Sequence, residues 1–123
     1  IIAFPASAQS NIDCGYPLNQ MEMTYCAEQS WKAADVELNA AYKAAMTRMK
    51  VTDSYLDDAL KGATDALRDA QRAWIPYRDK ACKSHGFLAR GGSMEPMLIY
   101  GCLSVLTQQR TDELKELAEG LGN

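Results

Sequence analysis

The chain has 123 residues, of which 47% are hydrophobic, and a formal net charge of -3. This length suits one domain with a modest core. Because the chain is mildly acidic and has no run of lysine and arginine, it is a poor match for nucleic acid or an anionic membrane surface. No apolar run approaches the ~20 residues that span a bilayer, so we expect no membrane insertion.

Residues 1–8 are apolar and uncharged, and they end in the small-residue pattern Ala6-Ser7-Ala8. That pattern is typical of a signal-peptidase site, with Gln9 as the first mature residue. A charged start and most of an apolar core are absent, so we interpret residues 1–8 as a residual signal-peptide tail. Residues 9–123 are then one helical domain. The alternative for residues 1–8 is an ordinary chain terminus.

The four cysteines are Cys14, Cys26, Cys82 and Cys102, and none belongs to a C-x-x-C pair. Their spacing therefore does not indicate a zinc site or a thioredoxin-like redox motif. An even number of dispersed cysteines in a small chain indicates structural disulfides, which persist in oxidising compartments. We expect a secreted or periplasmic protein with two disulfides.

The first predicted helix begins near Asn19, a favourable N-cap with Glu22 three residues later, as in a capping box. Apolar residues then recur at helical spacing, and the helix is expected to fade near Lys50. This first stripe consists of Trp31, Ala34, Leu38, Ala41, Tyr42, Ala45 and Met49.

Residues 51–54 predict a short break, after which Ser54 and Asp57 form a second capping signal. The second helix is expected to end just before Gly86, its C-terminal cap. Pro76 lies inside this helix and removes a backbone donor, which predicts a kink. The second stripe consists of Leu56, Leu60, Ala63, Leu67, Ala70, Trp74 and Tyr77.

Ser93 is expected to cap the third helix, with Pro96 tolerated in its first turn. Short connections between long helices make sequential neighbours antiparallel. We therefore predict an all-α fold, a three-helix antiparallel bundle with a kinked second helix and two disulfides. The third stripe consists of Ile99, Cys102, Leu103, Leu106, Arg110, Leu114 and Leu117.

This register favours one of the three possible cysteine pairings. Cys14 and Cys82 should lie at the same end of the bundle, while Cys26 and Cys102 each lie about two turns into parallel helices. We therefore expect Cys14–Cys82 and Cys26–Cys102. The second choice is Cys26–Cys82 with Cys14–Cys102.

The same register predicts an inward ion pair. Asp35 falls on or beside the first apolar stripe, and Arg110 falls on the third. The two charges should meet at one level, with Arg78 as a competing partner. Because inward charges are tolerable only when they are paired, we interpret the pair as a structural device that sets helix register.

Catalytic chemistry has little support in the sequence. His85 is the only histidine, so it cannot build a multi-histidine metal site, and its position at a helix end suits the helix dipole. We expect no Cys–His nucleophilic pair if all four cysteines are oxidised. We expect no catalytic residue, no metal and no cofactor.

Residues 70–82 match the pattern A-Q-x-x-W-x-x-Y-R-D-x-x-C. With residues 23–26, 34–42, 91–93 and 102–110, they resemble the lysozyme inhibitor LprI N-terminal-domain family over roughly residues 14–117. One departure is Thr24, where the family pattern has Asn. The resemblance implies a small secreted or periplasmic helical domain with disulfides, and it implies inhibition of lysozyme as a function.

Two interpretations of function remain open. One is a non-enzymatic inhibitor of a cell-wall hydrolase, with a basic lysozyme as the protein partner and Phe87, Leu88 and Arg90 as the binding residues. The other is a periplasmic immunity or structural accessory module with another protein partner. We expect Phe87 and Leu88 to pack on the end of the bundle. Their exposure would instead favour a binding role.

Overall fold

The computed structural model describes residues 11–121, and these form three long helices and two short 3-10 turns without a strand. The long helices are α2 (Gln20–Tyr55), α3 (Ala63–Gly86) and α4 (Glu95–Glu119). The short turns are η1 (Asp58–Leu60) and η2 (Phe87–Ala89). The interpretation of residues 1–8 as a signal-peptide tail lies outside the described residues.

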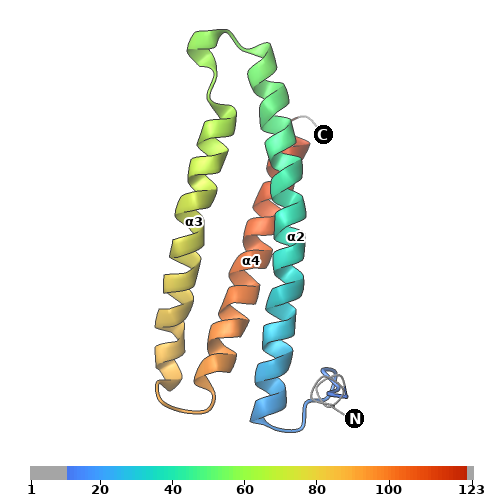
Figure 1. Ribbon diagram of the computed structural model, residues 1–123, viewed down its shortest axis with the longest axis vertical. Coiled ribbons are helices and arrows are strands. Elements are labelled where there is room, and N and C mark those ends of the chain that lie inside the picture. The colour runs from blue at the N-terminus through green and yellow to red at the C-terminus, as the bar shows by residue number, and fades with distance from the viewer. Residues whose placement is uncertain (1–10, 122–123) are drawn as a thin grey trace, which may run out of the picture.

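The helices run up, down and up, so α2 and α4 are parallel to each other and antiparallel to α3 (Figure 1). α4 packs most extensively on α2 and less on α3, and α2 has its fewest contacts with α3. The predicted three-helix antiparallel bundle is therefore confirmed. The second of the long helices, which contains Pro76, is bent by 17°. This bend is gentler than a sharp kink.

The main core lies where small side chains of α2 let the helices approach closely. Leu114 of α4 and Ala45 of α2 are completely buried. Partly buried aromatic and methionine side chains surround this centre, including Trp74 and Tyr42. Burial of such apolar side chains stabilises the fold by roughly 25 cal/mol per Å² removed from water. The fully buried cluster is Leu38, Ala41, Ala45, Leu67 and Leu114.

The start of α2 confirms the predicted cap. The Asn19 side chain accepts a hydrogen bond from the backbone N–H of Glu22 at 2.9 Å. The Glu22 carboxylate in turn accepts from the backbone N–H of Leu18 at 3.0 Å. The first bond satisfies a donor that the first turn of a helix leaves unpaired, and the second pairs the N–H of the residue just before the cap.

The predicted break after the first helix lies earlier in the chain than the observed one. α2 continues to Tyr55, and α3 begins at Ala63 rather than near Ser54. Ser54 donates its hydroxyl to the Val51 carbonyl inside α2, and Asp57 makes no side-chain cap bond. The capping signal was therefore wrong, and residue Leu60 of the expected second stripe is 67% exposed.

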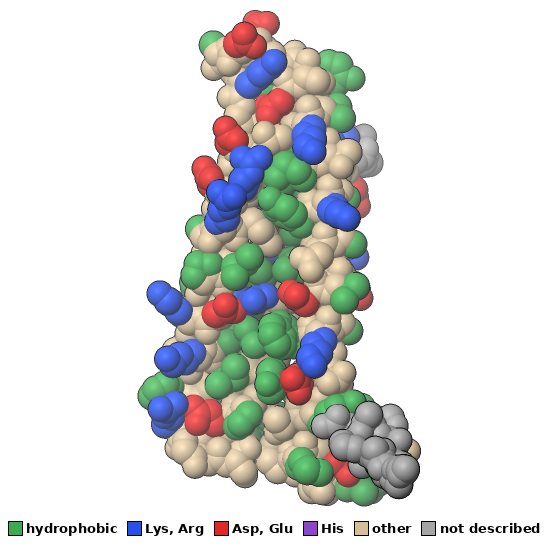
Figure 2. Space-filling view, in the orientation of Figure 1, with side chains coloured by type: hydrophobic (Ala, Val, Ile, Leu, Met, Phe, Trp, Pro, Cys, Tyr) green, Lys and Arg blue, Asp and Glu red, His purple; other side chains and the backbone are tan. Residues whose placement is uncertain are grey.

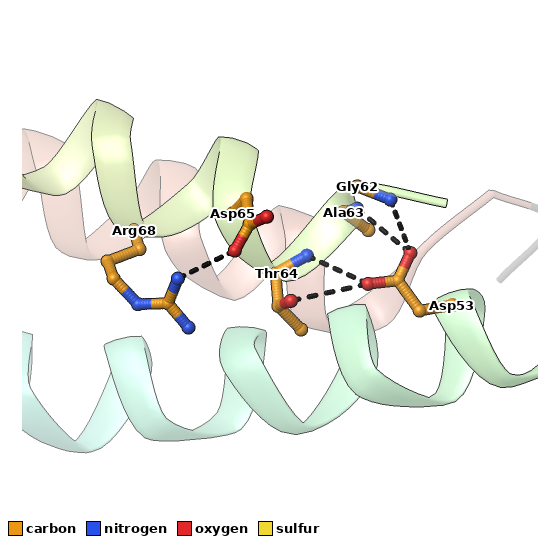
Figure 3. Close-up of polar contacts among 6 residues, drawn as sticks. All are labelled: Asp53, Gly62, Ala63, Thr64, Asp65 and Arg68. Atoms are coloured by element: carbon orange, nitrogen blue, oxygen red, sulfur yellow. Dashed lines mark hydrogen bonds and ion pairs between the residues drawn. The ribbon is translucent and has the colours of Figure 1, made fainter. Parts of the chain in front are cut away.

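Asp53 supplies the cap of α3 from the preceding helix (Figure 3). Its carboxylate accepts hydrogen bonds from the backbone N–H groups of Gly62, Ala63 and Thr64 at 3.0, 2.9 and 3.1 Å. These bonds, that from Gly62 foremost, lower the pKa of Asp53 to about 2. The Asp53 carboxylate thus caps the first turn of α3, and its negative charge lies at the positive end of the α3 dipole.

Both favoured cysteine pairings were wrong. The disulfides join Cys14 to Cys26 and Cys82 to Cys102, with Cα–Cα distances of 5.5 and 5.3 Å. A turn at Asp13, whose carbonyl accepts from the Tyr16 backbone N–H at 3.0 Å, folds the N-terminal segment back against α2. Cys82 and Cys102 lie near the connection between adjacent antiparallel helices, where the chain itself brings them to one level.

Candidate functional site

The connection between α3 and α4 lies at one end of the bundle (Figure 1). It presents large apolar side chains to solvent. Phe87 is 54% exposed and Leu88 is 76% exposed. The expectation that both pack on the end of the bundle was therefore wrong. Adjacent exposed large apolar residues in a loop are a candidate for contact with a protein partner.

Arg90 is held in place within this loop. Its guanidinium contacts the Glu95 carboxylate at 3.0 Å and lies over the Phe87 ring, 4.6 Å from the centroid. The same carboxylate accepts from the Gly91 backbone N–H at 3.1 Å. That bond first, and Arg90 second, lower the pKa of Glu95 below its ordinary value. The guanidinium is thus oriented before any partner arrives.

Glycines allow the loop to take this shape. Gly91 has a backbone φ of +83°, a value that residues other than glycine rarely adopt. Gly86 has ordinary helical geometry, with φ −61°, so it is not the left-handed cap that the sequence predicted. Instead, a Cβ at Gly86 would lie 2.7 Å from the Ile99 side chain, so glycine permits close packing of α3 on α4.

The start of α4 also differs from the prediction. The N-cap is Met94 rather than Ser93, and no side chain caps the helix there. Pro96 occupies the first turn as expected. Because the loop is closed by backbone bonds from Gly92 to Ala89 and from Glu95 to Gly92, a serine cap is not required.

Two disulfides restrain this end of the molecule. Cys82–Cys102 joins α3 to α4 directly behind the loop, and Cys82 is completely buried. Cys14–Cys26 holds the segment before α2, where Tyr16 and Leu18 are 73% and 72% exposed. Tyr16 and Leu18 were not among the predicted binding residues. The sequence did contain a signal for this surface, because two apolar residues flank Pro17 between Cys14 and Cys26.

Basic side chains lie beside the exposed loop. Lys80 and Lys83 of α3 line a shallow hollow of about 370 Å³ beside Phe87. Figure 2 shows basic side chains along this lower part of α3. Because Glu95 balances the charge of Arg90, these two lysines supply the excess positive charge of the loop end, although the whole chain is acidic. We call Phe87, Leu88, Arg90, Lys80 and Lys83 the loop-end surface.

The predicted ion pair formed with the competing partner. Arg78 contacts Asp35 at 3.5 Å and Asp79 at 2.9 Å. Arg110 instead donates to the Gln71 side chain at 2.9 Å and pairs with Glu113 at 3.0 Å. The Asp35–Arg110 pairing was therefore wrong.

The inner faces of the helices explain this outcome. Thr107 and Thr111 of α4 are buried, whereas Arg110 lies beside them and is only partly buried. The Arg78 guanidinium lies 5.9 Å from the Trp31 ring and 5.2 Å from the Trp74 ring. Such stacking on two aromatic faces suits a planar guanidinium and makes Arg78 part of the core.

Within residues 11–121, no group of three or more His, Cys, Asp and Glu side chains is arranged to hold a metal ion. His85 lies exposed in the last turn of α3. No helix of the described chain is both long enough and apolar enough to cross a membrane. The two disulfides indicate an oxidising compartment.

These features define a small disulfide-linked helical bundle with a preorganised, exposed loop. The chain belongs to the lysozyme inhibitor LprI family, whose model matches residues 14–114. It is 52% identical over 123 residues to an uncharacterised protein of Rhizobium meliloti (strain 1021), covering 97% of this chain and 88% of that protein. No solved structure matches the chain significantly.

Proposed function

We propose that this protein is a secreted or periplasmic, non-enzymatic inhibitor of lysozyme-type cell-wall hydrolases. Family membership over residues 14–114 supports the class of partner. The observation that supports the binding site is the exposure of Phe87 and Leu88 beside an oriented Arg90. In this proposal the loop-end surface enters the substrate cleft of the enzyme.

The chemistry of such a cleft matches the loop. Glycoside hydrolases flank the scissile bond with two carboxyl groups, so their clefts carry negative charge. The basic side chains of the loop-end surface complement that charge, while Phe87 and Leu88 supply apolar area to bury. Elsewhere the net acidity of the chain favours approach to a basic enzyme.

Preorganisation lowers the cost of binding. The loop is restrained by the Cys82–Cys102 disulfide behind it, by the Gly91 bond to Glu95, and by the Arg90 contact with Glu95. Ordering a mobile side chain on association costs about 0.5–1.5 kcal/mol. A loop that is already ordered avoids most of that cost.

The test is inhibition of peptidoglycan lysis by chicken-type, goose-type and invertebrate-type lysozymes, using the oxidised protein. We expect inhibition of at least one type and a loss of about tenfold or more for the variant Phe87→Ser/Leu88→Ser. The matched control is Val36→Ser, because Val36 is an equally exposed apolar residue (70%) on α2, outside the loop.

Two results would count against the proposal. Absence of inhibition against all three lysozymes would leave the family membership without this activity and would favour another protein partner. Equal inhibition by the loop variant and the Val36→Ser control would retain the activity but move it away from the loop. Binding that weakens with added salt is expected, since charged groups surround the apolar residues.

A further inference from the structure

A groove lies between α2 and α3, away from the loop-end surface, and has a volume of about 450 Å³. In Figure 1, α2 and α3 run antiparallel to each other on either side of α4. Figure 2 shows basic side chains along α3 beside apolar side chains between the helices. The α2 wall includes Asn39 and Tyr42, and the α3 wall includes Arg68, Arg72 and Ile75.

The charge of this lining opposes the charge of the whole chain. Three arginines face one aspartate in the lining, whereas the chain has a net charge of -3. Arg78 and Asp35, the two innermost charges, already contact each other at 3.5 Å. Arg68 and Arg72 therefore account for the excess positive charge.

These two arginines differ in what they already bind. Arg68 pairs with Asp65 at 2.8 Å, as Figure 3 shows. The Arg72 side chain is exposed and makes no ion pair or hydrogen bond with any described residue. They stand one helical turn apart, and like charges at that spacing repel each other. An anion placed between them would relieve the repulsion.

The groove also offers apolar surface and a free amide. Ile75 is 41% exposed, and Tyr42 is partly buried. The exposed Asn39 carries an amide that can both donate to and accept from a peptide backbone. Together these groups provide a charged anchor, an apolar contact and a backbone contact within one groove.

We propose that this groove binds an acidic peptide segment, with its carboxylates on Arg72 and Arg68 and an apolar side chain against Ile75 and Tyr42. Along α3, Arg68 and Arg72 are about 6 Å apart. Alternate side chains of an extended peptide are about 6.6 Å apart on one face, so two carboxylates can reach both arginines. Arginine binds carboxylates through paired hydrogen bonds that a point charge does not make.

The probe is a fluorescein-labelled, end-capped hexapeptide with glutamate at positions one and three, leucine at position five and glycine between them, so that all three side chains share one face of an extended chain. Its binding is measured by fluorescence anisotropy with the oxidised full chain. We expect saturable binding that weakens as salt is added. Arg72→Gln should weaken it about tenfold, because a charge-assisted hydrogen bond is lost. Lys115→Gln is the matched control, since Lys115 is exposed on α4 outside the groove and its removal changes the net charge equally.

Several outcomes would overturn the proposal. These are absence of binding, equal loss in Arg72→Gln and Lys115→Gln, and equal binding of a peptide with glutamine in place of glutamate. Binding to vesicles of anionic lipid with no binding to the peptide would identify a different ligand and would also overturn it. Because Arg72→Gln leaves the loop-end surface intact, it should inhibit lysozyme as the unsubstituted chain does, so this proposal and the proposed function fail separately.

Discussion

Arg78 brings a full positive charge into the bundle, where its side chain is 9% exposed. The ion pair with Asp35 and the contacts with two tryptophan rings do not stabilise this side chain equally. Asp35 is 42% exposed and stands 3.5 Å away, whereas two tryptophan rings cover the guanidinium. We therefore attribute most of the stabilisation to stacking and burial of the Arg78 side chain rather than to the ion pair with Asp35.

This attribution predicts unequal effects of two substitutions. Arg78→Ala should lower the free energy of unfolding by about 2–4 kcal/mol, through lost aromatic contacts and a cavity. Asp35→Ala should cost less than about 1 kcal/mol, because exposed ion pairs contribute little and Arg78 keeps Asp79 at 2.9 Å. Urea denaturation of both variants measures the difference. Equal losses would assign the stabilisation to the ion pair.

Asp53 makes stability depend on pH. Its pKa is lowered to about 2 from 3.8, so the folded state binds its proton less readily than the unfolded state. The stabilisation is complete above about pH 4 and disappears as the pH falls through about 2. Glu95, whose pKa is also lowered, adds to the same acid-side loss.

Asp53→Asn should therefore reduce the melting temperature near neutral pH by about 3–6 °C and flatten its decline between pH 4 and 2. Asp57→Asn is the control, since the Asp57 side chain caps no helix. Thermal unfolding followed by circular dichroism measures both. An unchanged pH profile for Asp53→Asn would show that the carboxylate does not cap α3.

At the scale of elements, the sequence located the helices better than their ends. The cap at Asn19 was predictable because donor and acceptor lie three residues apart. The cap of α3 was not, because Asp53 reaches across the turn to residues 62–64, and local spacing cannot reveal that contact. Gly86 was likewise read as a helix terminator, although it is needed for packing against Ile99.

The packing role of Gly86 predicts opposite effects of two glycine substitutions. Gly86→Ala should destabilise the protein by about 1–3 kcal/mol, because its Cβ would lie 2.7 Å from Ile99 Cγ1. Gly101→Ala in α4 should stabilise it by up to about 1 kcal/mol, since no heavy atom lies within 4 Å of the added Cβ. Urea denaturation compares the free energies of unfolding of the two variants. Stabilisation by both substitutions would exclude close packing of Gly86 against Ile99.

At the scale of the whole molecule, the sequence predicted the bundle but not its cross-links. Helical periodicity and short connections determine the topology, whereas the cysteine pairing depends on which helix faces meet. The parallel contact of α2 with α4 suggested a Cys26–Cys102 bond. The chain instead closes each disulfide over a short separation, 12 residues for Cys14–Cys26 and 20 for Cys82–Cys102.

The two disulfides should differ in their influence on the loop. Replacing both Cys82 and Cys102 with serine should cost about 2–4 kcal/mol and weaken partner binding, because this bond joins the helices behind the loop. The corresponding Cys14 and Cys26 variant should keep the loop intact. Unreduced peptide mapping followed by urea denaturation measures pairing and stability. A Cys26–Cys102 peptide in the unreduced map would contradict the structure.

The most direct test of the binding site is a titration of the ¹⁵N-labelled oxidised protein with a lysozyme that it inhibits, followed by backbone amide chemical shifts. The proposal predicts that the largest changes lie in residues 86–95 and in the last turns of α3, with small changes along the groove between α2 and α3. Changes concentrated in that groove, or at the far end around Asp53, would contradict the assignment of inhibition to the exposed loop.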